Sequence, residues 1–489
     1  MLDAYSRRDP ILILDDGTQL TRAALEELMA PFRKAFDSSA KLLVLCFAAR
    51  NVPTIVCSFS AMAAGHALSL VDPAGRGTDS AYSLQPDIVV DSTGDARIPA
   101  PSPGAYREVR APDRSPVRVY RRRHPAERRL FDDLALLLAT SGSTGRMRFV
   151  RLSRKNLDAN ASAISEGLGL DSSTRAITSL PLGYSYGLSI LNSSRWAGAP
   201  VVVSDAHPAS SRFWEIVRAQ RVTAVSGVPL TYELLLRSSF DPGSFGGVTH
   251  YTQAGGKLSA NSLRAFASRL RPGQAIVPMY GQTEATARMT ILRWEDFWSH
   301  SDSVGKPISG GTMWIEKPDG SVLPDGAVGQ LVYAGPNVML GYADGPDSLG
   351  GGDDLNGTLH TGDLGFMREG FVHVTGRTSR FAKIGGYRIS LDRIEEQLAG
   401  YGRCAAVNLD DEAVAIVFES MGPLFARDEA AALRLVAKRI ALPPPAFRVI
   451  FLDELPRLPS GKIDLLRLAD AVGASEARDA PNRITKLVV

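Results

Sequence analysis

Two segments far apart in the chain carry residue types that can handle phosphate and carboxylate groups. A run of small and hydroxyl-bearing residues ends the apolar stretch 134–139, and Lys462 lies in a turn-like segment near the C-terminus. Backbone N–H groups and hydroxyls in such a run can cradle phosphate oxygens. A lysine on a turn can bring a mobile positive charge to a reacting carboxylate and phosphate. The small-residue run consists of Thr140, Ser141, Gly142, Ser143, Thr144 and Gly145.

Three shorter motifs lie between these segments and complete an ordered set. They are residues 280–284 (Tyr-Gly-Gln-Thr-Glu), 360–363 (His-Thr-Gly-Asp) and 376–377 (Gly-Arg). The set resembles the adenylate-forming superfamily of AMP-dependent synthetases and ligases, which includes acyl-CoA synthetases, adenylation domains of peptide synthetases and luciferases. The resemblance extends from about Thr21 to about Leu468, which is nearly the whole chain.

The resemblance implies an ATP site in which residues 280–284 hold the base, the α-phosphate and a metal ion. Tyr280, followed by Gly281, lies against adenine, because a flat apolar face suits a base. Thr283 touches the α-phosphate through its hydroxyl. Glu284 helps to hold Mg²⁺, a hard cation that prefers oxygen ligands. Thr283 and Glu284 are therefore expected to take part in catalysis.

The same resemblance assigns the ribose and the reacting centre. Asp363 accepts hydrogen bonds from the ribose hydroxyls, and Arg377 supports it and faces the phosphate. Lys462 bridges the carboxylate and the α-phosphate during adenylation, where negative charge gathers on both partners. No general base is required, because a carboxylate is already ionised at neutral pH. The segment that lets adenine approach the backbone closely is Ala254, Gly255 and Gly256.

Two positions depart from the family pattern. Arg148 stands where the pattern has a lysine after the phosphate loop; it keeps the charge, adds a fork for bidentate contact, and is expected to stabilise the pyrophosphate leaving group. Gly183 and Tyr184 stand where many members have an aromatic residue followed by histidine. The two nearby tyrosines fit a substrate pocket and core packing equally well. The predicted pocket contains Tyr184, Tyr186, Ser226, Gly255 and Ala287.

Alternating strands and helices must position these residues. The apolar run 41–48 predicts a strand buried on both faces, followed by a helix at 51–65. Further along, short Gly- and Pro-rich runs after Gly305, such as 330–333, predict a small distorted β-barrel. The alternation, which predicts an α/β core of layered subdomains, continues through 67–71, 86–90, 134–139, 156–167, 178–180, 190–198, 201–204, 212–221 and 224–226.

A domain boundary is predicted at residue 377, which separates an N-terminal adenylation core (1–377) from a C-terminal lid (378–489). In the family such a lid is mobile and rotates between half-reactions, with Ser379 standing here at the hinge position. Gly385 and Gly386 would let a nucleophile pass close to the backbone. The lid is predicted to be α+β, with strands around 383–389, at 405–410 and at 413–419, and helices at 391–399 and 427–440.

Composition points to a cytoplasmic protein. The formal net charge of +3 gives no reason to expect nucleic acid or a membrane surface as a partner. Met1–Pro10 is polar and charged, so no signal peptide is expected. The three cysteines have no ligand spacing and are predicted to be core residues. The arginine-rich stretch 118–129 is either a solvated strand edge or a docking patch for an acidic carrier protein.

The predicted function is an ATP- and Mg²⁺-dependent, AMP-forming ligase that activates a carboxylic acid and releases pyrophosphate. The acceptor is coenzyme A, the thiol of a carrier protein acting in trans, or an amine, and a specialised biosynthetic pathway is expected. One alternative is a ligase that activates nitrite and diazotises an aromatic amine. A nucleotide-binding protein with degraded catalysis and a luciferase-type oxygenation also stay open.

Overall fold

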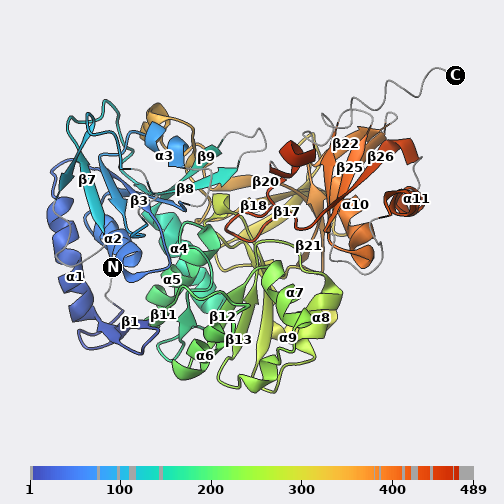
Figure 1. The fold of residues 1–489 in the computed structure, drawn as a ribbon, viewed down its shortest axis with the longest axis horizontal. Helices are drawn as coiled ribbons and strands as arrows, with labels where there is room; N and C mark the ends of the chain where they lie inside the picture. The colour runs from blue at the N-terminus through green and yellow to red at the C-terminus, as the bar shows by residue number, and fades with distance from the viewer. Residues whose placement is uncertain are drawn as a thin grey trace. The chain divides into compact units, whose positions relative to one another are not determined.

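The computed structural model describes residues 4–73, 78–95, 98, 100–109, 117–141, 147–378, 380–384, 387–409, 413–419, 428–440, 444–465 and 467–472 (Figure 1). By its internal contacts the chain divides into two compact units. The first unit comprises Met1–Trp314, Val332–His360 and Arg368–His373. The second comprises Ile315–Leu331, Thr361–Met367 and Val374–Val489. The boundary expected at residue 377 stays a prediction.

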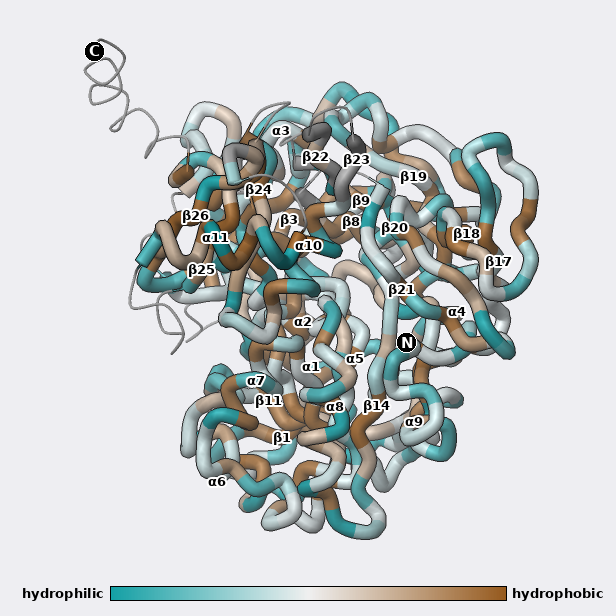
Figure 2. The backbone as a smooth tube through the Cα atoms, turned by 90° about the vertical axis from the view of Figure 1, so that its right-hand side faces the viewer, coloured by the Kyte–Doolittle hydropathy of each residue, from teal (hydrophilic) through white to brown (hydrophobic). Residues whose placement is uncertain are grey.

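Continuous apolar segments form the inner strands of the first unit. All five residues of β3 (Leu43–Phe47) are buried, and β3 pairs in parallel with β4 (Ala67–Val71) and β5 (Ile88–Asp91). A strand that carries apolar residues at successive positions can be stable only when both of its faces are covered. Figure 2 shows the same hydrophobic character along β1 (Pro10–Leu14) and β14 (Ala275–Tyr280).

The described residues of the first unit build two large sheets. One has eight strands, in the order β19 (Gly341–Ala343), β9 (Met147–Ser153), β8 (Leu134–Ser141), β4, β3, β5, β7 (Arg118–Arg122) and β6 (Tyr106–Val109). The other has nine, in the order β16 (Lys306–Pro307), β15 (Thr290–Ile291), β14, β13 (His250–Gln253), β12 (Ala224–Gly227), β10 (Ala176–Ile177), β11 (Val201–Val203), β1 and β2 (Gln19–Thr21).

Helices accompany these sheets, and local capping explains where several of them start. Asn51 accepts a hydrogen bond from the backbone N–H of Thr54 at the start of α2, and Ser153 and Asn156 form a reciprocal capping box on α4. Helices α4 and α5 lie side by side in Figure 1. The helices are α1 (Arg22–Ala35), α2 (Val52–Ala63), α3 (Thr78–Ser83), α4 (Arg154–Leu168), α5 (Ser185–Ala197), α6 (Ser211–Ala219), α7 (Pro229–Arg237), α8 (Ala260–Ala267) and α9 (Trp294–His300).

The prediction was wrong around residues 178–198. The strand expected at 178–180 is β10, which ends at Ile177, and the helix expected from residue 190 begins at Ser185. Polar side chains explain both shifts. The hydroxyl of Thr178 donates to the carbonyl of Ser204, and the first turns of α5 are buried although they are not aliphatic. Hydrophobicity alone therefore missed the part of α5 that reaches the site.

The remaining strands and helices follow residue 311. Within the described residues, a four-stranded sheet has the order β17 (Thr312–Glu316), β18 (Gly329–Ala334), β20 (Thr358–Arg368) and β21 (Phe371–Arg377). A two-stranded sheet pairs β22 (Phe381–Ile384) with β23 (Tyr387–Ser390), and a three-stranded sheet has the order β24 (Cys404–Asn408), β25 (Val414–Glu419) and β26 (Phe447–Leu452). Helix α10 (Leu391–Leu398) packs on β24, and α11 (Glu429–Ile440) packs on β26.

No helix in the described part of the chain combines the length and the apolar character that a membrane span requires.

Candidate active site

The hairpin of β8 and β9 carries the described ends of the predicted phosphate loop. Thr140 and Arg148 are cross-strand partners, and the hydroxyl of Thr140 donates to the carbonyl of Arg148 at 3.4 Å. Ser141 pairs with Met147 at the open end of the same ladder. The hairpin therefore places Thr140, the first residue of the predicted loop, beside Arg148. The predicted loop residues Gly142, Ser143, Thr144 and Gly145 lie outside the described residues.

Arg148 is held by an aromatic ring. Its guanidinium carbon lies 4.2 Å from the ring centroid of Tyr342, which stands on the neighbouring strand β19. The Nε atom of Arg148 is buried and has no hydrogen-bond partner among the described residues. A buried donor without an acceptor is costly, so an anion beside Arg148 would be bound favourably. This arrangement suits the predicted contact with phosphate.

Tyr342 links Arg148 to Glu284. The Tyr342 hydroxyl donates to Oε1 of Glu284 at 2.9 Å, and burial, together with the neighbouring Glu284 carboxylate, raises the pKa of Tyr342. Thr283, in a short 3₁₀ turn (Thr283–Ala285) after β14, has its hydroxyl 3.1 Å from that of Ser185 at the start of α5. Two predicted residues, Arg148 and Glu284, thus both contact Tyr342. A third, Thr283, directly precedes Glu284 in the chain.

Asn337 clamps the loop that carries Glu284. Its side-chain amide donates to the carbonyls of Ala285 and Arg288 at 2.8 and 2.9 Å, and its Oδ1 accepts from Tyr333 at 2.8 Å. The clamp matters because Thr286 and Ala287 adopt φ angles of 58° and 108°, which non-glycine residues rarely adopt. Tertiary contacts, rather than local propensity, therefore fix the position of the Glu284 carboxylate.

The predicted adenine wall lies at the carboxyl ends of two parallel strands. Ala254, Gly255 and Gly256 follow β13, and Tyr280 and Gly281 end β14, its parallel neighbour. In open α/β sheets ligands bind at such ends. Gly281 must be glycine, because an added Cβ would lie 2.2 Å from the carbonyl oxygen of Ala287. The structure brings the two segments together as the resemblance implied.

The predicted pocket residues divide into two groups. Tyr186 is buried, and its hydroxyl donates to the carbonyl of Thr252 at 2.9 Å. The hydroxyl of Ser226 lies 2.8 Å from that of Thr252. These two side chains belong to a hydrogen-bonded core network. Tyr184 lies beside Gly255 of the predicted adenine wall, because a Cβ added at Gly255 would be 2.5 Å from the Tyr184 hydroxyl. Burial raises the pKa of Tyr184 to about 12.

Arg288 is a buried cation that the sequence did not single out. It is 2% exposed, and its guanidinium carbon lies 3.8 Å from the ring centroid of Tyr186. Its Nε contacts the sulfur of Met279 at 3.3 Å, and Nη1 donates to the carbonyl of Ala287 at 3.2 Å. Burial lowers its pKa. Ala287 itself is buried beside it. The feature of the sequence that could have indicated a buried arginine is the position of Arg288 among the mostly small and apolar residues 285–289.

Asp363 and Arg377 meet in the second unit. Asp363 is 4% exposed, and Arg377 donates from Nε to its Oδ1 at 2.9 Å. The backbone N–H of Asp363 also donates to the hydroxyl of Thr361 at 3.0 Å, which fixes the turn at Gly362. A carboxylate held in this way is oriented to accept further hydrogen bonds, as the predicted ribose contact requires.

Lys462 lies on a tight turn in the second unit. The N–H of Leu458 donates to the carbonyl of Lys462 at 2.8 Å, and Gly461 takes a φ of 80° that glycine tolerates. Arg457 donates from Nη1 to the carbonyl of Gly461 at 3.2 Å, and its guanidinium lies 3.8 Å from the Glu419 carboxylate. The turn is thus braced while the lysine side chain is exposed.

The predicted hinge and glycine segment are described only in part. Ser379, Gly385 and Gly386 lie outside the described residues, so their roles stay predictions. Arg380 forms an ion pair with Glu395 at 2.6 Å and donates to the carbonyl of Ala406 at 3.0 Å. These contacts tie the segment after the hinge position to the sheet and helix of the second unit.

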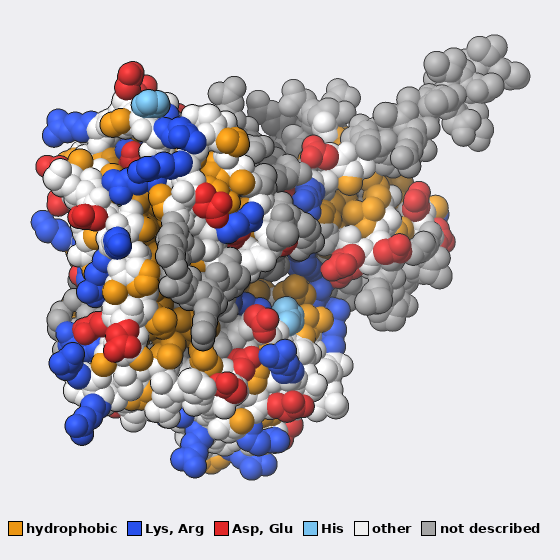
Figure 3. Space-filling model, turned by 60° about the vertical axis from the view of Figure 1, so that its left-hand side comes forward, with side chains coloured by type: hydrophobic (Ala, Val, Ile, Leu, Met, Phe, Trp, Pro, Cys, Tyr) orange, Lys and Arg blue, Asp and Glu red, His pale blue; other side chains and the backbone are white. Residues whose placement is uncertain are grey.

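The arginine-rich stretch 118–129 stabilises the edge of the eight-stranded sheet. Arg118 and Arg128 form ion pairs with Asp91 and Asp87, each at 2.6 Å, and Arg121 donates to the carbonyl of Asp37 at 3.2 Å. In Figure 3 the Lys and Arg side chains on this face lie interspersed with Asp and Glu. These contacts favour the structural interpretation of the stretch over a docking patch.

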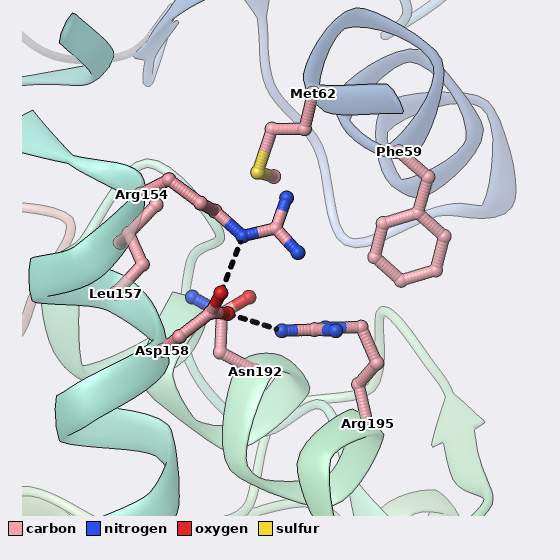
Figure 4. A pocket seen from close by; sticks show the side chains of 7 residues that line it. All are labelled: Phe59, Met62, Arg154, Leu157, Asp158, Asn192 and Arg195. Atoms are coloured by element: carbon pink, nitrogen blue, oxygen red, sulfur yellow. Dashed lines mark hydrogen bonds and ion pairs between the residues drawn. The ribbon is translucent and has the colours of Figure 1, made fainter. Parts of the chain in front are cut away.

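A small cavity elsewhere in the first unit does not fit a substrate. Its volume is about 10 Å³, and Asp158 in it forms ion pairs with Arg154 and Arg195 at 2.8 and 2.9 Å (Figure 4). Such a volume holds about one water molecule. No group of three or more His, Cys, Asp or Glu side chains arranged to hold a metal was found in the described chain.

Known proteins resemble this chain over most of its length. Sulfoacetate–CoA ligase from Cupriavidus necator is 32% identical over 346 residues, which are 69% of this chain and 67% of that protein. Feruloyl-CoA synthase from an Amycolatopsis species is 29% identical over 344 residues, 68% of each chain. The solved structure of o-succinylbenzoate CoA synthetase from Bacillus subtilis with its acyl-adenylate intermediate is 22% identical and covers 94% of this chain and 95% of that chain, with a TM-score of 0.75.

The structural likeness confirms the predicted α/β fold class. The model of one protein family, described as AMP-binding enzyme, matches residues 4–343. That span contains Thr140, Arg148, Thr283, Glu284 and Tyr342, the residues that the first unit brings together. The chain therefore belongs to the family of AMP-binding enzymes.

Proposed function

We propose that this protein is an ATP-dependent acid–thiol ligase that activates a small carboxylic acid as its acyl-adenylate and then forms its thioester with coenzyme A. The observation that carries the proposal is the cluster of Arg148, Tyr342 and Glu284 beside Thr283. It combines a cation for phosphate, which lies on the Tyr342 ring, with a hard carboxylate bonded to the Tyr342 hydroxyl and with the hydroxyl of the adjacent residue Thr283. The acid–CoA ligases among the relatives support the second half-reaction.

In the first half-reaction, a carboxylate oxygen attacks the α-phosphorus of ATP, and the bond to the bridging oxygen of the β-phosphate breaks. Pyrophosphate leaves with the electron pair of that bond. Arg148 stabilises the leaving group by charge and hydrogen bonds, and Thr283 contacts the α-phosphate. Lys462 compensates the charge of the carboxylate and the phosphate as they approach. Asp363, supported by Arg377, holds the ribose hydroxyls.

Glu284 fits the role of a ligand for Mg²⁺. A carboxylate has two oxygens with about four lone-pair sites, so the hydrogen bond from Tyr342 does not exhaust it. Oxygen ligands suit this hard cation, which also takes phosphates and water as ligands. When bound, the ion neutralises phosphate charge. The loop clamp at Asn337 keeps the Glu284 carboxylate at a fixed place before ATP arrives.

In the second half-reaction, the thiol sulfur of coenzyme A attacks the acyl carbon, the bond from that carbon to the AMP oxygen breaks, and the thiol proton passes to solvent. AMP leaves as the second product. We assign the passage of the thiol to the lid segment that contains Gly385 and Gly386, with Ser379 as the hinge. This assignment rests on the sequence motif.

Pyrophosphate release tests the proposal directly. The protein is mixed with ATP and a panel of acids (short and long aliphatic, aryl, amino and sulfonated) and with nitrite plus an aromatic amine, and pyrophosphate and AMP are measured with and without coenzyme A. We expect release that depends on a carboxylic acid, and a thioester when coenzyme A is present. Release with nitrite alone would contradict the proposal in favour of diazotisation, and silence with every compound would leave a nucleotide-binding protein.

A further inference from the structure

Arg288 carries a positive charge in the interior of the first unit without a carboxylate to balance it. No ion pair joins Arg288 to an Asp or Glu in the described part of the chain, and the side chain is 2% exposed. Its contacts are the face of Tyr186, the sulfur of Met279 and the carbonyl of Ala287. A thioether is a weak acceptor. None of these partners carries a negative charge, so they do not neutralise the guanidinium.

A purely structural role does not require a charge at this position. A buried ion is costly unless it is paired, and an apolar side chain of similar volume fills such a space at lower cost. Met279 and Tyr186 would pack equally well against methionine or leucine. Burial lowers the pKa of Arg288, which shows that the surroundings disfavour the cation. An anion bound beside the guanidinium would remove this penalty.

Arg288 is connected through α5 to the residue that is proposed to contact the α-phosphate. The hydroxyl of Ser185 is 3.1 Å from that of Thr283, the proposed contact of the α-phosphate. Tyr186, the next residue after Ser185, carries the ring over which Arg288 lies at 3.8 Å. The loop from Thr283 to Arg288 is fixed at both ends by the clamp from Asn337 and by Asn160, which donates to the carbonyl of Arg288 at 2.9 Å. Thr283 and Arg288 thus lie on one braced loop, five residues apart in the chain, and contact consecutive residues of α5.

We infer that the acid carries a second anionic group, a carboxylate or a sulfonate, and that Arg288 binds this group while the first carboxylate reacts with ATP. The inference rests on the proposed function, because it places the acid between Thr283 and Arg288. The planar fork matches a carboxylate or sulfonate through paired hydrogen bonds. The substrate class is therefore small dicarboxylic or sulfonated carboxylic acids.

Matched acids test this assignment without any variant. Malonate is compared with malonamate, and sulfoacetate with methylsulfonylacetate, so that each pair differs in the second charge and little in shape. Pyrophosphate release gives kcat and KM for each acid. We expect kcat/KM to be roughly 100-fold higher for the charged member of a pair, as for a charge-assisted contact with a buried group. Equal values within the pairs would overturn the inference.

The variants Arg288→Met and Arg288→Lys test whether the preference for a second anionic group depends on Arg288. Methionine keeps much of the volume and removes the charge, and lysine keeps the charge but loses the fork. We expect Arg288→Met to lower kcat/KM for the charged acids roughly 100-fold, mainly through KM, while the neutral analogues and the KM for ATP change little. Arg288→Lys should retain part of the preference. The matched control is Arg293→Met, the same change at an exposed arginine five positions along the chain, which should leave the preference intact.

The results distinguish a failure of this inference from a failure of the proposed function. Pyrophosphate release with neutral acids but no preference for the second charge would overturn this inference and leave the proposed function standing. A loss of activity in Arg288→Met that is equal for charged and neutral acids would also overturn it, because it would assign Arg288 to ATP, to the reacting carboxylate or to folding. Silence with every acid in the wild type would overturn both proposals. A preference that disappears in Arg288→Met alone would support the assignment.

Discussion

At the scale of single residues, this chain places its cations in two different ways. Arg148 and Arg288 lie against the rings of Tyr342 and Tyr186, at 4.2 and 3.8 Å, so their positions are set before any ligand binds. Lys462 is exposed on a turn whose backbone is braced. Fixed cations suit groups that must be recognised in one geometry, and a flexible lysine suits charge that develops during reaction.

Lys462→Ala should slow adenylation by on the order of 100-fold or more, because it removes an electrostatic stabiliser of the transition state. The affinity for ATP should change little, since the other residues assigned to the base, ribose and phosphates hold the nucleotide. The measurement is acid-dependent pyrophosphate release, combined with direct binding of ATP. Lys438→Ala removes an exposed lysine from α11 and is the control. Near-normal adenylation in Lys462→Ala would refute the role assigned to it.

Tyr342→Phe should separate the two contacts of Tyr342. The change deletes the hydrogen bond to Glu284 and keeps the ring that supports Arg148. A hydrogen bond to a charged group contributes about 1.5–3 kcal/mol, so kcat/KM for ATP should fall about 10- to 100-fold, and Tyr342→Leu should cost more. Tyr82→Phe is the control, because the buried Tyr82 hydroxyl has no hydrogen-bond partner in the described chain. A Tyr342→Phe enzyme with unchanged ATP kinetics would show that the bond does not position Glu284.

At the scale of elements, the site is built from loops that other loops hold in place. The 3₁₀ turn at Thr283–Ala285 and the following residues depend on Asn337, which lies between β18 and β19. The turn of Lys462 depends similarly on Arg457 and Glu419. Each catalytic loop is therefore fixed by polar side chains from a distant segment, as catalytic loops on a rigid scaffold require.

Asn337→Ala should destabilise the first unit. Asn337 is 1% exposed and donates to two carbonyls, so the change leaves buried acceptors without partners. The expected loss is about 2–4 kcal/mol in the free energy of unfolding, measured by denaturant titration, together with weaker ATP binding from the loosened loop. Asn261→Ala, at an exposed position on α8, controls for the loss of an amide. Wild-type stability in Asn337→Ala would rule out the clamp.

At the scale of the whole molecule, the sequence predicted what local patterns determine. The buried strands β3 and β4, the helix α2 and the residues Thr283 and Glu284 were expected where they are found. Tyr342 and Asn337 were missed, because their roles arise only when segments more than 50 residues apart are folded together. Tyr342 meets Glu284 across a separation of 58 residues. A lone tyrosine or asparagine carries no mark of such a partner in the sequence.

Acid should weaken the folded state through two histidines that are partly or fully buried. Burial lowers the pKa of His250, on β13, and that of His373, on β21, below the ordinary value of 6.5. Well above pH 6.5 each is neutral whether the chain is folded or unfolded. As the pH falls below 6.5, the histidines of the unfolded chain bind protons while those of the folded chain stay neutral. The free energy of unfolding should therefore fall by up to ~1.4 kcal/mol per pH unit for each histidine, until the lowered pKa of the folded state is reached.

Denaturant titrations between pH 7 and pH 5 measure this slope. His250→Gln should flatten it, whereas His124→Gln, at an exposed position, should not. If His250→Gln leaves the slope unchanged, acid sensitivity comes from groups other than the half-buried histidine at the start of β13.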